Sequence, residues 1–539
     1  MTCYAYLFEA KSIQSYIFNS NKLKEIVGAS ELVDDLCAQP LQDTLKALAI
    51  ESDIEFSRRA GGAFFAFSTN GDAIERLAAL WPLVVEIQAP GLDFVHARGE
   101  GASNILAYEQ ARRGLAGYRN TRPPALPVAG PFAARCRRTG MPATAWRGKA
   151  GEAVDAATAR KLDLSRGKSL TEKFNPGTNA TWPLQLSREP GEENDDVFPY
   201  DGEREGLALI HADGNGLGQL LITLSERLKA HPKFVACFKA FSDAIGRATE
   251  AAAKQATHEV LVSKVSANQV MPARPIVLGG DDLTVLVRSD LALDFASTFI
   301  QHFEEQTAKE LLSVYAQMKQ DGVDISGLPA GLSACAGIVF MKASQPFYMA
   351  HQLAEDLCKA AKAQAKEPQN KVAGRIPSAL AFHRITTAHI GRYADILARE
   401  LTVREGGNKA TNDAARSYCQ TLVTYTLSAH NHLPRLDDLR AFTALLEGLS
   451  RGPMRQLVGV LGQDMAAARR QYQRWRSLME KEQGDRLNKF DDGLHALLKA
   501  GTFTELPYRA DGQQYRTPLG DALTLMAVRK QIEFRENAA

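Results

Sequence analysis

The chain has 539 residues, of which 45% are hydrophobic and 23% are charged, and its formal net charge is +2. This length and composition predict a globular protein of two to four domains with real hydrophobic cores. Seven cysteines without a single Cys-x-x-Cys pair exclude a disulfide framework and a four-cysteine zinc ribbon. The sequence shows no signal-peptide pattern and no apolar run of bilayer length. We therefore expect a cytoplasmic protein that does not contact a membrane.

The first half is expected to open with a buried strand at 4–8, "YAYLF", followed by a helix from about 13 to 26. We expect Gly28 to end this helix and Ser30 to cap the next one. The segment "EFSRRAGGAFFAFS" then alternates on both sides of a Gly-Gly pair, which is typical of a β-hairpin.

A linker is predicted near 190–206, where "PGEENDDVFPYDGEREG" is rich in proline, glycine and charge. A second domain follows, with a strand at 207–211, "LALIH", and the Gly-rich turn "ADGNGLGQLL" leading into a helix. After two helical stretches come the hairpin "IVLGGDDLTVLV", the strand "LSACAGIVF" and the helix "FYMAHQLAEDLCKAAKAQAK". Past about residue 390 the pattern is helical throughout.

The two halves therefore form an internal repeat, because each places a Gly-Gly hairpin after a strand and helices. The residues after the glycines differ between the two copies. They are Ala63 and Phe64 after Gly61-Gly62, and Asp281 and Asp282 after Gly279-Gly280. The first copy shows that the hairpin forms without aspartates, and we expect Phe64 to pack in a core.

Two adjacent carboxylates on a tight turn repel one another unless a cation lies between them. Oxygen ligands suit Mg²⁺ or Mn²⁺, which proteins often hold with one or two carboxylates and phosphate oxygens. Asp213 follows the strand at 207–211, and we expect it to converge with Asp281 and Asp282 if that strand neighbours the hairpin. Such a site could hold two ions, while Gly279 and Gly280 leave room for substrate. The alternative is a solvated turn without a metal.

A second candidate feature is a run of arginines between Gly101 and Arg147 that faces a single acid, Glu109. Such a strip could bind the phosphates of a nucleic acid, or it could be a solvated face near a linker. Its members are Arg112, Arg113, Arg119, Arg122, Arg135, Arg137, Arg138 and Arg147.

The second half resembles the catalytic palm of the large subunit of type III CRISPR effector complexes, whose signature is Gly-Gly-Asp-Asp and whose relatives include GGDEF diguanylate cyclases. "HADGNGLGQLL", with Gly214 and Asn215, is similar to the first palm strand and its turn; many relatives have a second acid at Asn215. "LAEDLCKAAK" is similar to the helix whose lysine meets the triphosphate, which makes Lys362 the candidate phosphate ligand. The first half is similar to the degenerate first palm of that family.

The resemblance implies an α+β chain of two ferredoxin-like palm domains of the GGDEF/cyclase type, with helical insertions and a C-terminal helical domain. The expected boundaries are 1–130 for the degenerate first palm, 131–205 for a small linker domain, 206–390 for the catalytic second palm, and 391–539 for the helical domain. No N-terminal His-Asp nuclease domain is expected, because the first palm strand starts at Tyr4. No zinc site is expected between the palms, where only Cys136 remains.

The function implied by the resemblance is synthesis of cyclic oligoadenylates, or a related cyclic nucleotide, from ATP for antiviral defence. Asp213, Asp281 and Asp282 would hold Mg²⁺ or Mn²⁺, and Gly214, Asn215, Gly279, Gly280 and Lys362 would contact the nucleotide. Guide or target RNA and other effector subunits are candidate partners, although the chain could also act alone. Two alternatives stay open: a diguanylate-type cyclase that uses GTP, and a non-catalytic scaffold that binds RNA.

Overall fold

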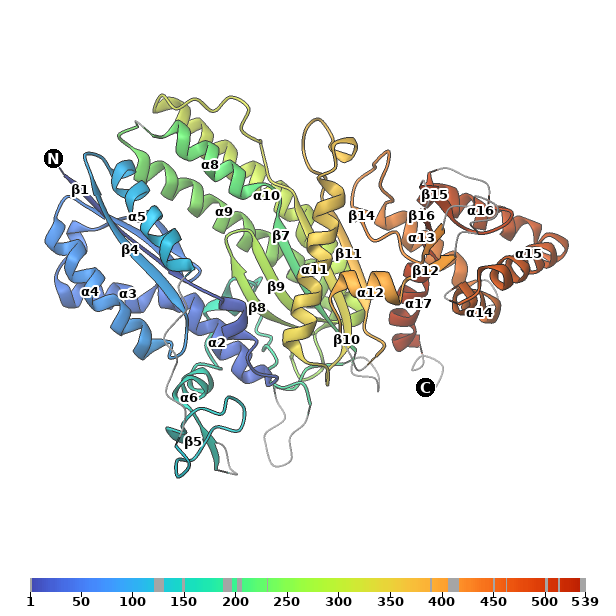
Figure 1. Ribbon diagram of the computed structural model, residues 1–539, viewed down its shortest axis with the longest axis horizontal. Helices are drawn as coiled ribbons and strands as arrows, with labels where there is room; N and C mark the ends of the chain where they lie inside the picture. The colour runs from blue at the N-terminus through green and yellow to red at the C-terminus, as the bar shows by residue number, and fades with distance from the viewer. Residues whose placement is uncertain are drawn as a thin grey trace.

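The computed structural model describes residues 2–120, 130–147, 151–187, 196–200, 206–229, 231–387, 390–405, 416–448, 451–461, 463–499, 503–511 and 514–533. Two palm domains lie side by side, a small module lies beneath the first of them, and a C-terminal region follows the second (Figure 1). None of the helices in these ranges is long and apolar enough to cross a membrane.

The first palm is a four-stranded antiparallel sheet in the order β2-β3-β1-β4. Its central strand β1 is buried on both faces: Ala5 and Leu7 join one hydrophobic core, while Tyr6 and Phe8 join the other, as the two-residue period of a strand requires. Its elements are β1 (Cys3–Ala10), α1 (Ile13–Ile17), α2 (Leu23–Leu36), α3 (Gln39–Leu48), β2 (Glu55–Ala60), β3 (Ala63–Ser68), α4 (Gly71–Gln88), β4 (Phe94–Gly101) and α5 (Asn104–Arg119).

Two sequence-based expectations for the first palm are wrong. Gly28 does not end a helix and Ser30 does not cap one, because both lie inside α2. A Cβ atom at Gly28 would lie 1.7 Å from the carbonyl oxygen of Lys161, so glycine is required by the close approach of another segment. The hydroxyl of Ser30 donates to the carbonyl of Ile276 in the second palm.

The second palm repeats the same order of elements around a six-stranded sheet, β14-β11-β10-β7-β9-β8. All neighbouring strands are antiparallel except β10 and β11. Its elements are β7 (Gly206–Gly214), α8 (Leu217–Arg227), α9 (Phe234–Ala256), β8 (Ala273–Gly279), β9 (Asp282–Arg288), α10 (Ala292–Gln320), β10 (Ala334–Lys342), α11 (Phe347–Ala365) and β11 (Ala379–Arg384), with β14 (Tyr425–Thr426) at the edge. The mixed α/β fold with two palms agrees with the predicted fold class.

The repeat is offset by one residue from the alignment that the sequence suggested. Gly279 pairs with Asp282 across the second hairpin, and Ala60 pairs with Ala63 across the first. The two-residue turns are therefore Gly280-Asp281 and Gly61-Gly62, so Asp281 and Asp282 correspond to Gly62 and Ala63. Sequence alignment fails here because it matches the glycine pairs, whereas the strand register matches the turn positions. The prediction that Phe64 packs in a core is confirmed, since it is fully buried.

A small module follows the first palm and packs against α2. It consists of β5 (Ala145–Arg147), β6 (Glu152–Val154), α6 (Ala156–Asp163) and α7 (Ser169–Glu172). Four polar residues are linked in its interior, partly through the backbone. Thr139 donates to the carboxylate of Asp155, which also accepts from the backbone N–H of Thr158 at 2.7 Å, while the sulfur of Cys136 lies 3.9 Å from the Thr158 hydroxyl.

The C-terminal region is mainly helical but is not helical throughout, which corrects the sequence-based expectation. It contains a four-stranded sheet, β12-β13-β16-β15. Each of these strands has only three or four residues, too few for a periodic pattern to be recognised. The elements are α12 (Tyr393–Arg399), β12 (Thr402–Glu405), β13 (Arg416–Cys419), α13 (Leu436–Glu447), α14 (Arg451–Leu461), α15 (Met465–Glu482), α16 (Gly484–Leu498), β15 (Arg509–Asp511), β16 (Gln514–Arg516) and α17 (Leu519–Glu533).

Candidate functional site

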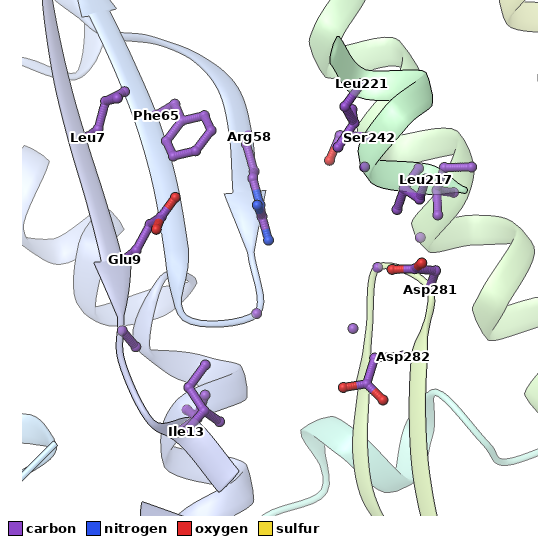
Figure 2. A pocket seen from close by; sticks show the side chains of 18 of the residues that line it. Leu7, Glu9, Ile13, Arg58, Phe65, Leu217, Leu221, Ser242, Asp281 and Asp282 are labelled. Carbon is purple, nitrogen blue, oxygen red and sulfur yellow. The ribbon is translucent and has the colours of Figure 1, made fainter. Parts of the chain in front are cut away.

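A cavity of about 990 Å³ lies between the two palms, and the hairpin tips of both palms line it. Figure 2 shows the first-palm strands on one side and the second-palm hairpin, beneath α8 and α9, on the other. The first palm contributes Glu9, Arg58, Gly61, Arg112 and Arg119, among others. The second contributes Leu217, Leu221, Ser242, Gly279, Gly280, Asp281 and Asp282. The first palm therefore presents three arginines, with Glu9 and Asp34 beside them, to the acidic hairpin.

The turn that bears Asp281 depends on two glycines. Gly280 has a φ of +63°, a left-handed conformation that glycine adopts without strain. A Cβ atom at Gly214 would lie only 2.6 Å from a carboxylate oxygen of Asp281, so the absence of a side chain there leaves room for this aspartate. The N–H of Gly214 also donates to the carbonyl of Asp281 at 3.2 Å.

Asp213 lies directly opposite Asp282, because β7 and β9 are neighbours in the sheet. The ammonium of Lys362 on α11 donates to the carboxylate of Asp213 and, at 2.8 Å, to the carbonyl of Gly214. The Lys362 side chain is only 14% exposed, so it is not a surface lysine. Its charge also acts to lower the pKa values of Asp281 and Asp282.

The same face of the sheet carries His211 and Thr284, two residues from Asp213 and Asp282 along their strands. Nδ1 of His211 lies 3.2 Å from the hydroxyl of Thr284 and 3.4 Å from Oδ1 of Asp282. Burial lowers the pKa of His211 below its ordinary value, which favours the neutral ring. His211 therefore supports this face without adding a positive charge to it.

The electrostatics of the site favour a cation. Burial, and then the charge of Asp213, raises the pKa of Asp282 to about 8, and the same two causes raise the pKa of Asp281. Oδ1 of Asp282 is buried without a hydrogen-bond partner. The buried, mutually repelling carboxylates and the unpaired oxygen each destabilise the site, and a bound positive ion would offset this. The donors are all carboxylate oxygens, the type that Mg²⁺ and Mn²⁺ prefer, so the residues fit such an ion.

The three aspartates are neighbours, but their convergence on one point was predicted and is not found. Asp281 sits in the turn while Asp282 begins the strand, and Figure 2 shows their carboxylates at different levels of the hairpin. Within the part of the chain that the structure describes, no group of three or more His, Cys, Asp or Glu side chains is arranged to hold a metal ion. Because Mg²⁺ in phosphate sites often takes only one or two carboxylates, a three-residue cage is not required.

Four predicted site residues, Asp213, Gly214, Asn215 and Lys362, are not among the residues that line the cavity. Asn215 is 6% exposed, and its amide donates to Ser333 at 3.0 Å and to the sulfur of Cys335 at 3.5 Å. The predicted contacts of Gly214, Asn215 and Lys362 with the nucleotide stay predictions.

The arginines do not form one continuous strip. Arg112, Arg113 and Arg119 lie on or beside the cavity wall formed by α5, whereas the later ones belong to the small module. Several are held by acids: Arg119 by Glu9, Arg138 by Glu25 and Glu152, and Arg147 by Asp163. Arg122 lies outside the described residues. Of the set in the module, Arg135 and Arg137 are exposed.

Sequence analysis missed Thr249, His211 and Glu355. Glu355 on α11 contributes to the raised pKa of Asp282. His211 could have been found, because a residue two positions before Asp213 in a strand shares its face. Thr249 lies 31 positions before the turn that it contacts, so no local pattern could indicate it.

A sheet of this connectivity, with carboxylates on its β8–β9 hairpin beneath two helices, defines a palm-type domain. Residues 206–373 match the family model described as Cas10/Cmr2, second palm domain. This match, which covers less than half of the chain, confirms the resemblance of the second half to the palm of the large subunit of type III CRISPR effector complexes. No curated protein matches the sequence.

Solved structures of Csm1-Csm4 cassettes are similar to the chain at low identity. The cassette in complex with cA4 has 12% identity and a TM-score of 0.47, covering 98% of this chain and 70% of that one. The cassette in complex with AMPPNP has 13% identity and a TM-score of 0.46, with the same coverage. The cassette in complex with one ATP has 12% identity and a TM-score of 0.45, again covering 98% and 70%.

Proposed function

We propose that the chain is a metal-dependent nucleotidyltransferase that joins ATP into cyclic oligoadenylate or a related cyclic nucleotide. The observation that supports this most is the acidic hairpin of Asp281 and Asp282, which faces a cavity in a domain of the Cas10/Cmr2 second-palm type. The cavity, at about 990 Å³, is at the upper end of the range for small-molecule sites. It has room for more than one small ligand.

In the proposed reaction, the 3′-hydroxyl of one nucleotide loses its proton and its oxygen bonds to the α-phosphorus of another. The bond between the α- and β-phosphates breaks, and pyrophosphate leaves. Asp281, Asp282 and Asp213 would hold Mg²⁺ or Mn²⁺, which lowers the pKa of the attacking hydroxyl and stabilises the charge on the leaving group. Lys362 orients Asp213 through its hydrogen bond. The arginines of the first palm, Arg58, Arg112 and Arg119, would attract the phosphates electrostatically across the cavity.

The experiment is incubation of the purified chain with each nucleoside triphosphate and Mg²⁺ or Mn²⁺, with and without RNA, and analysis of products by mass spectrometry. We expect cyclic oligoadenylate and pyrophosphate from ATP. Cyclic products from GTP alone would favour the diguanylate-type cyclase. Release of orthophosphate alone would indicate an ATPase, and no turnover under any condition would favour the scaffold.

RNA is proposed as a partner because of the charge and surface of the small module. Residues 130–187 hold ten Lys or Arg against four Asp or Glu, a surplus of six positive charges, although the whole chain carries only +2. The module also exposes Phe132 fully and Trp146 by 66%. Exposed aromatic rings beside basic side chains are typical of surfaces that bind single-stranded nucleic acid by stacking and charge.

The corresponding test replaces Arg137 with Glu and Phe132 and Trp146 with Ala. We expect weaker binding to single-stranded RNA and a shallower dependence of affinity on salt, because phosphate contacts release counterions. Arg138→Glu is unsuitable as a test, since Arg138 holds Glu25 and Glu152 and its reversal would disturb the module itself. Unchanged affinity and salt dependence would show that this surface does not bind RNA. Other effector subunits are proposed partners on the basis of the family match alone.

A further inference from the structure

One buried threonine contacts the acidic turn from outside its own hairpin. Thr249 lies in α9 and is 1% exposed. Its hydroxyl oxygen lies 2.9 Å from the carbonyl of Ile245, one helical turn earlier, and 2.5 Å from the carbonyl of Gly280. A threonine inside a helix commonly donates to the carbonyl four residues earlier. Because a hydroxyl has one proton, Thr249 donates to one of these carbonyls at a time, and the shorter contact, with the turn, is what distinguishes it.

The position of this contact determines what it restrains. The carbonyl of Gly280 and the N–H of Asp281 belong to one planar peptide unit, so a bond to that carbonyl fixes the plane that precedes Asp281. The next peptide unit is fixed as well, because the N–H of Gly214 donates to the carbonyl of Asp281. With both flanking planes held, the direction of the Cα–Cβ bond of Asp281 is set.

The first palm provides an internal comparison. The carbonyl of Gly62, the counterpart of Asp281, accepts from the N–H of Ala10 at 2.8 Å, just as that of Asp281 accepts from Gly214. The carbonyl of Gly61, the counterpart of Gly280, accepts no side-chain hydrogen bond among the described residues. The extra restraint is therefore found on the hairpin that carries the carboxylates and not on the one that lacks them.

We propose that Thr249 is a positioning residue that holds the Gly280–Asp281 peptide and so aims the carboxylate of Asp281 into the cavity. This inference rests on the proposed function for its catalytic consequence, since aiming a carboxylate matters only where it binds an ion or substrate. The restraint itself is a property of the turn. It can be measured without any turnover.

The test compares three variants of the full chain. Thr249→Val is nearly isosteric and removes the hydroxyl, while Thr249→Ser keeps it. Thr257→Val is the matched control, because Thr257 is also fully buried and donates to the carbonyl four residues earlier, Ala253, at 2.8 Å, without contacting the turn. Thr257 directly follows α9, so any loss caused by removing a buried hydroxyl that donates to a carbonyl of this helix is common to both valine variants.

The first measurement is hydrogen exchange of the backbone amides of residues 280–283, without metal. We expect about tenfold faster exchange in Thr249→Val, a change of the size expected for one lost hydrogen bond. Thr249→Ser and Thr257→Val should behave like the wild type. Equal exchange in the two valine variants would overturn the proposal, as would a serine variant that behaves like the valine one.

The second measurement tests Mn²⁺ binding and ATP turnover. In a Mn²⁺ titration followed by melting temperature, Thr249→Val should need roughly tenfold more Mn²⁺ for the same stabilisation. Its ATP turnover should fall about ten- to hundredfold in kcat with little change in KM, because a small misplacement of a reacting group is costly. If the wild type makes no product and shows no Mn²⁺ effect, the proposed function fails, whereas the exchange result still decides the role of Thr249.

Discussion

The two hairpins that face each other across the cavity share their register but not their chemistry. Glu9 lies opposite Ala63 in the first palm, as Asp213 lies opposite Asp282 in the second. Each of these two strand acids is held by a basic side chain from the helix after the fourth strand of its palm: Glu9 by Arg119 of α5, and Asp213 by Lys362 of α11. The first palm has thus kept one acid and its basic partner, and it lacks the two acids at the tip.

The comparison shows that the hairpin requires its turn glycines but does not require the carboxylates. Gly61 and Gly62 both have positive φ angles, so a two-residue turn of this kind forms with no carboxylate present. In the second palm, Asp281 and Asp282 have raised pKa values and an unpaired buried oxygen. The two carboxylates destabilise the second palm, and the first palm folds without them. They therefore indicate a role other than folding.

The largest effect is expected from removing the acids of the second hairpin. Asp281→Asn combined with Asp282→Asn should lower product formation by at least about a thousandfold, as loss of catalytic groups usually does. The metal-free protein should melt at the same temperature or higher, because the repulsion is gone. Extra stabilisation by Mg²⁺ with ATP should disappear. Product formed at the wild-type rate would refute the proposed site, and Glu9→Gln is the matched control in the first palm.

A carboxylate placed in the first hairpin should damage the fold. Ala63→Asp would put a second carboxylate at a position that is 5% exposed, opposite Glu9, whose basic partner Arg119 is already engaged. We expect a loss of about 2–3 kcal/mol in the free energy of unfolding, the cost of an unpaired buried polar group. Chemical denaturation of the variant and the wild type measures this. A variant of wild-type stability would mean that the first palm accommodates acids as readily as the second.

Lys362 and Arg119, the basic partners of Asp213 and Glu9, should differ in their effect on turnover. Lys362→Met should reduce turnover roughly tenfold, because the Lys362 charge lowers the pKa values of both hairpin aspartates and its ammonium orients Asp213. Arg119→Met should have less than about 1 kcal/mol of effect on stability, since the Arg119 side chain is 55% exposed. Parallel assays of kcat and melting temperature compare them. Equal losses of kcat would contradict this ranking, in which Lys362 acts at the aspartates and Arg119 only attracts phosphates.

The smallest effect is a pH dependence of stability. The pKa of Asp282 is raised from 3.8 to about 8, so between these values the folded state keeps a proton that the unfolded chain has lost. The stability linked to this carboxyl is complete below about pH 4 and is lost as the pH rises through 8. The slope is at most about 1.4 kcal/mol per pH unit, and less here because the side chain is one-third exposed.

Chemical denaturation between pH 6 and 8.5, with a chelator present, measures that slope. The double variant Asp281→Asn, Asp282→Asn should be flatter than the wild type over this interval, and saturating Mg²⁺ with ATP should flatten the wild type as well. Identical slopes in wild type and variant would show that the aspartates are ionised in the metal-free protein.

The sequence predicted the repeat, the position of both hairpins and the proximity of Asp213 to the acidic pair, because alternating apolar residues and glycine turns are local signals. It misplaced the register by one residue, since glycine pairs mark a turn without saying which two residues form it. Gly28 was misassigned for a different reason. Glycine occupies this position inside a helix because Lys161, more than a hundred positions later, approaches the backbone there and leaves no room for a Cβ atom. Contacts such as that of Thr249 with Gly280 are likewise set by packing between distant elements.

The polar cluster in the small module has a practical consequence for testing the proposed metal site. Cys136 and Thr139 are three positions apart on a turn, and Asp155 and Thr158 are three positions apart where α6 begins, the spacing at which paired cysteines would grip a structural ion. Here hydrogen bonds link the four residues instead, one of them through the backbone N–H of Thr158. Chelators should therefore leave the module folded, so that a metal titration of the whole chain reports on the proposed site in the second palm.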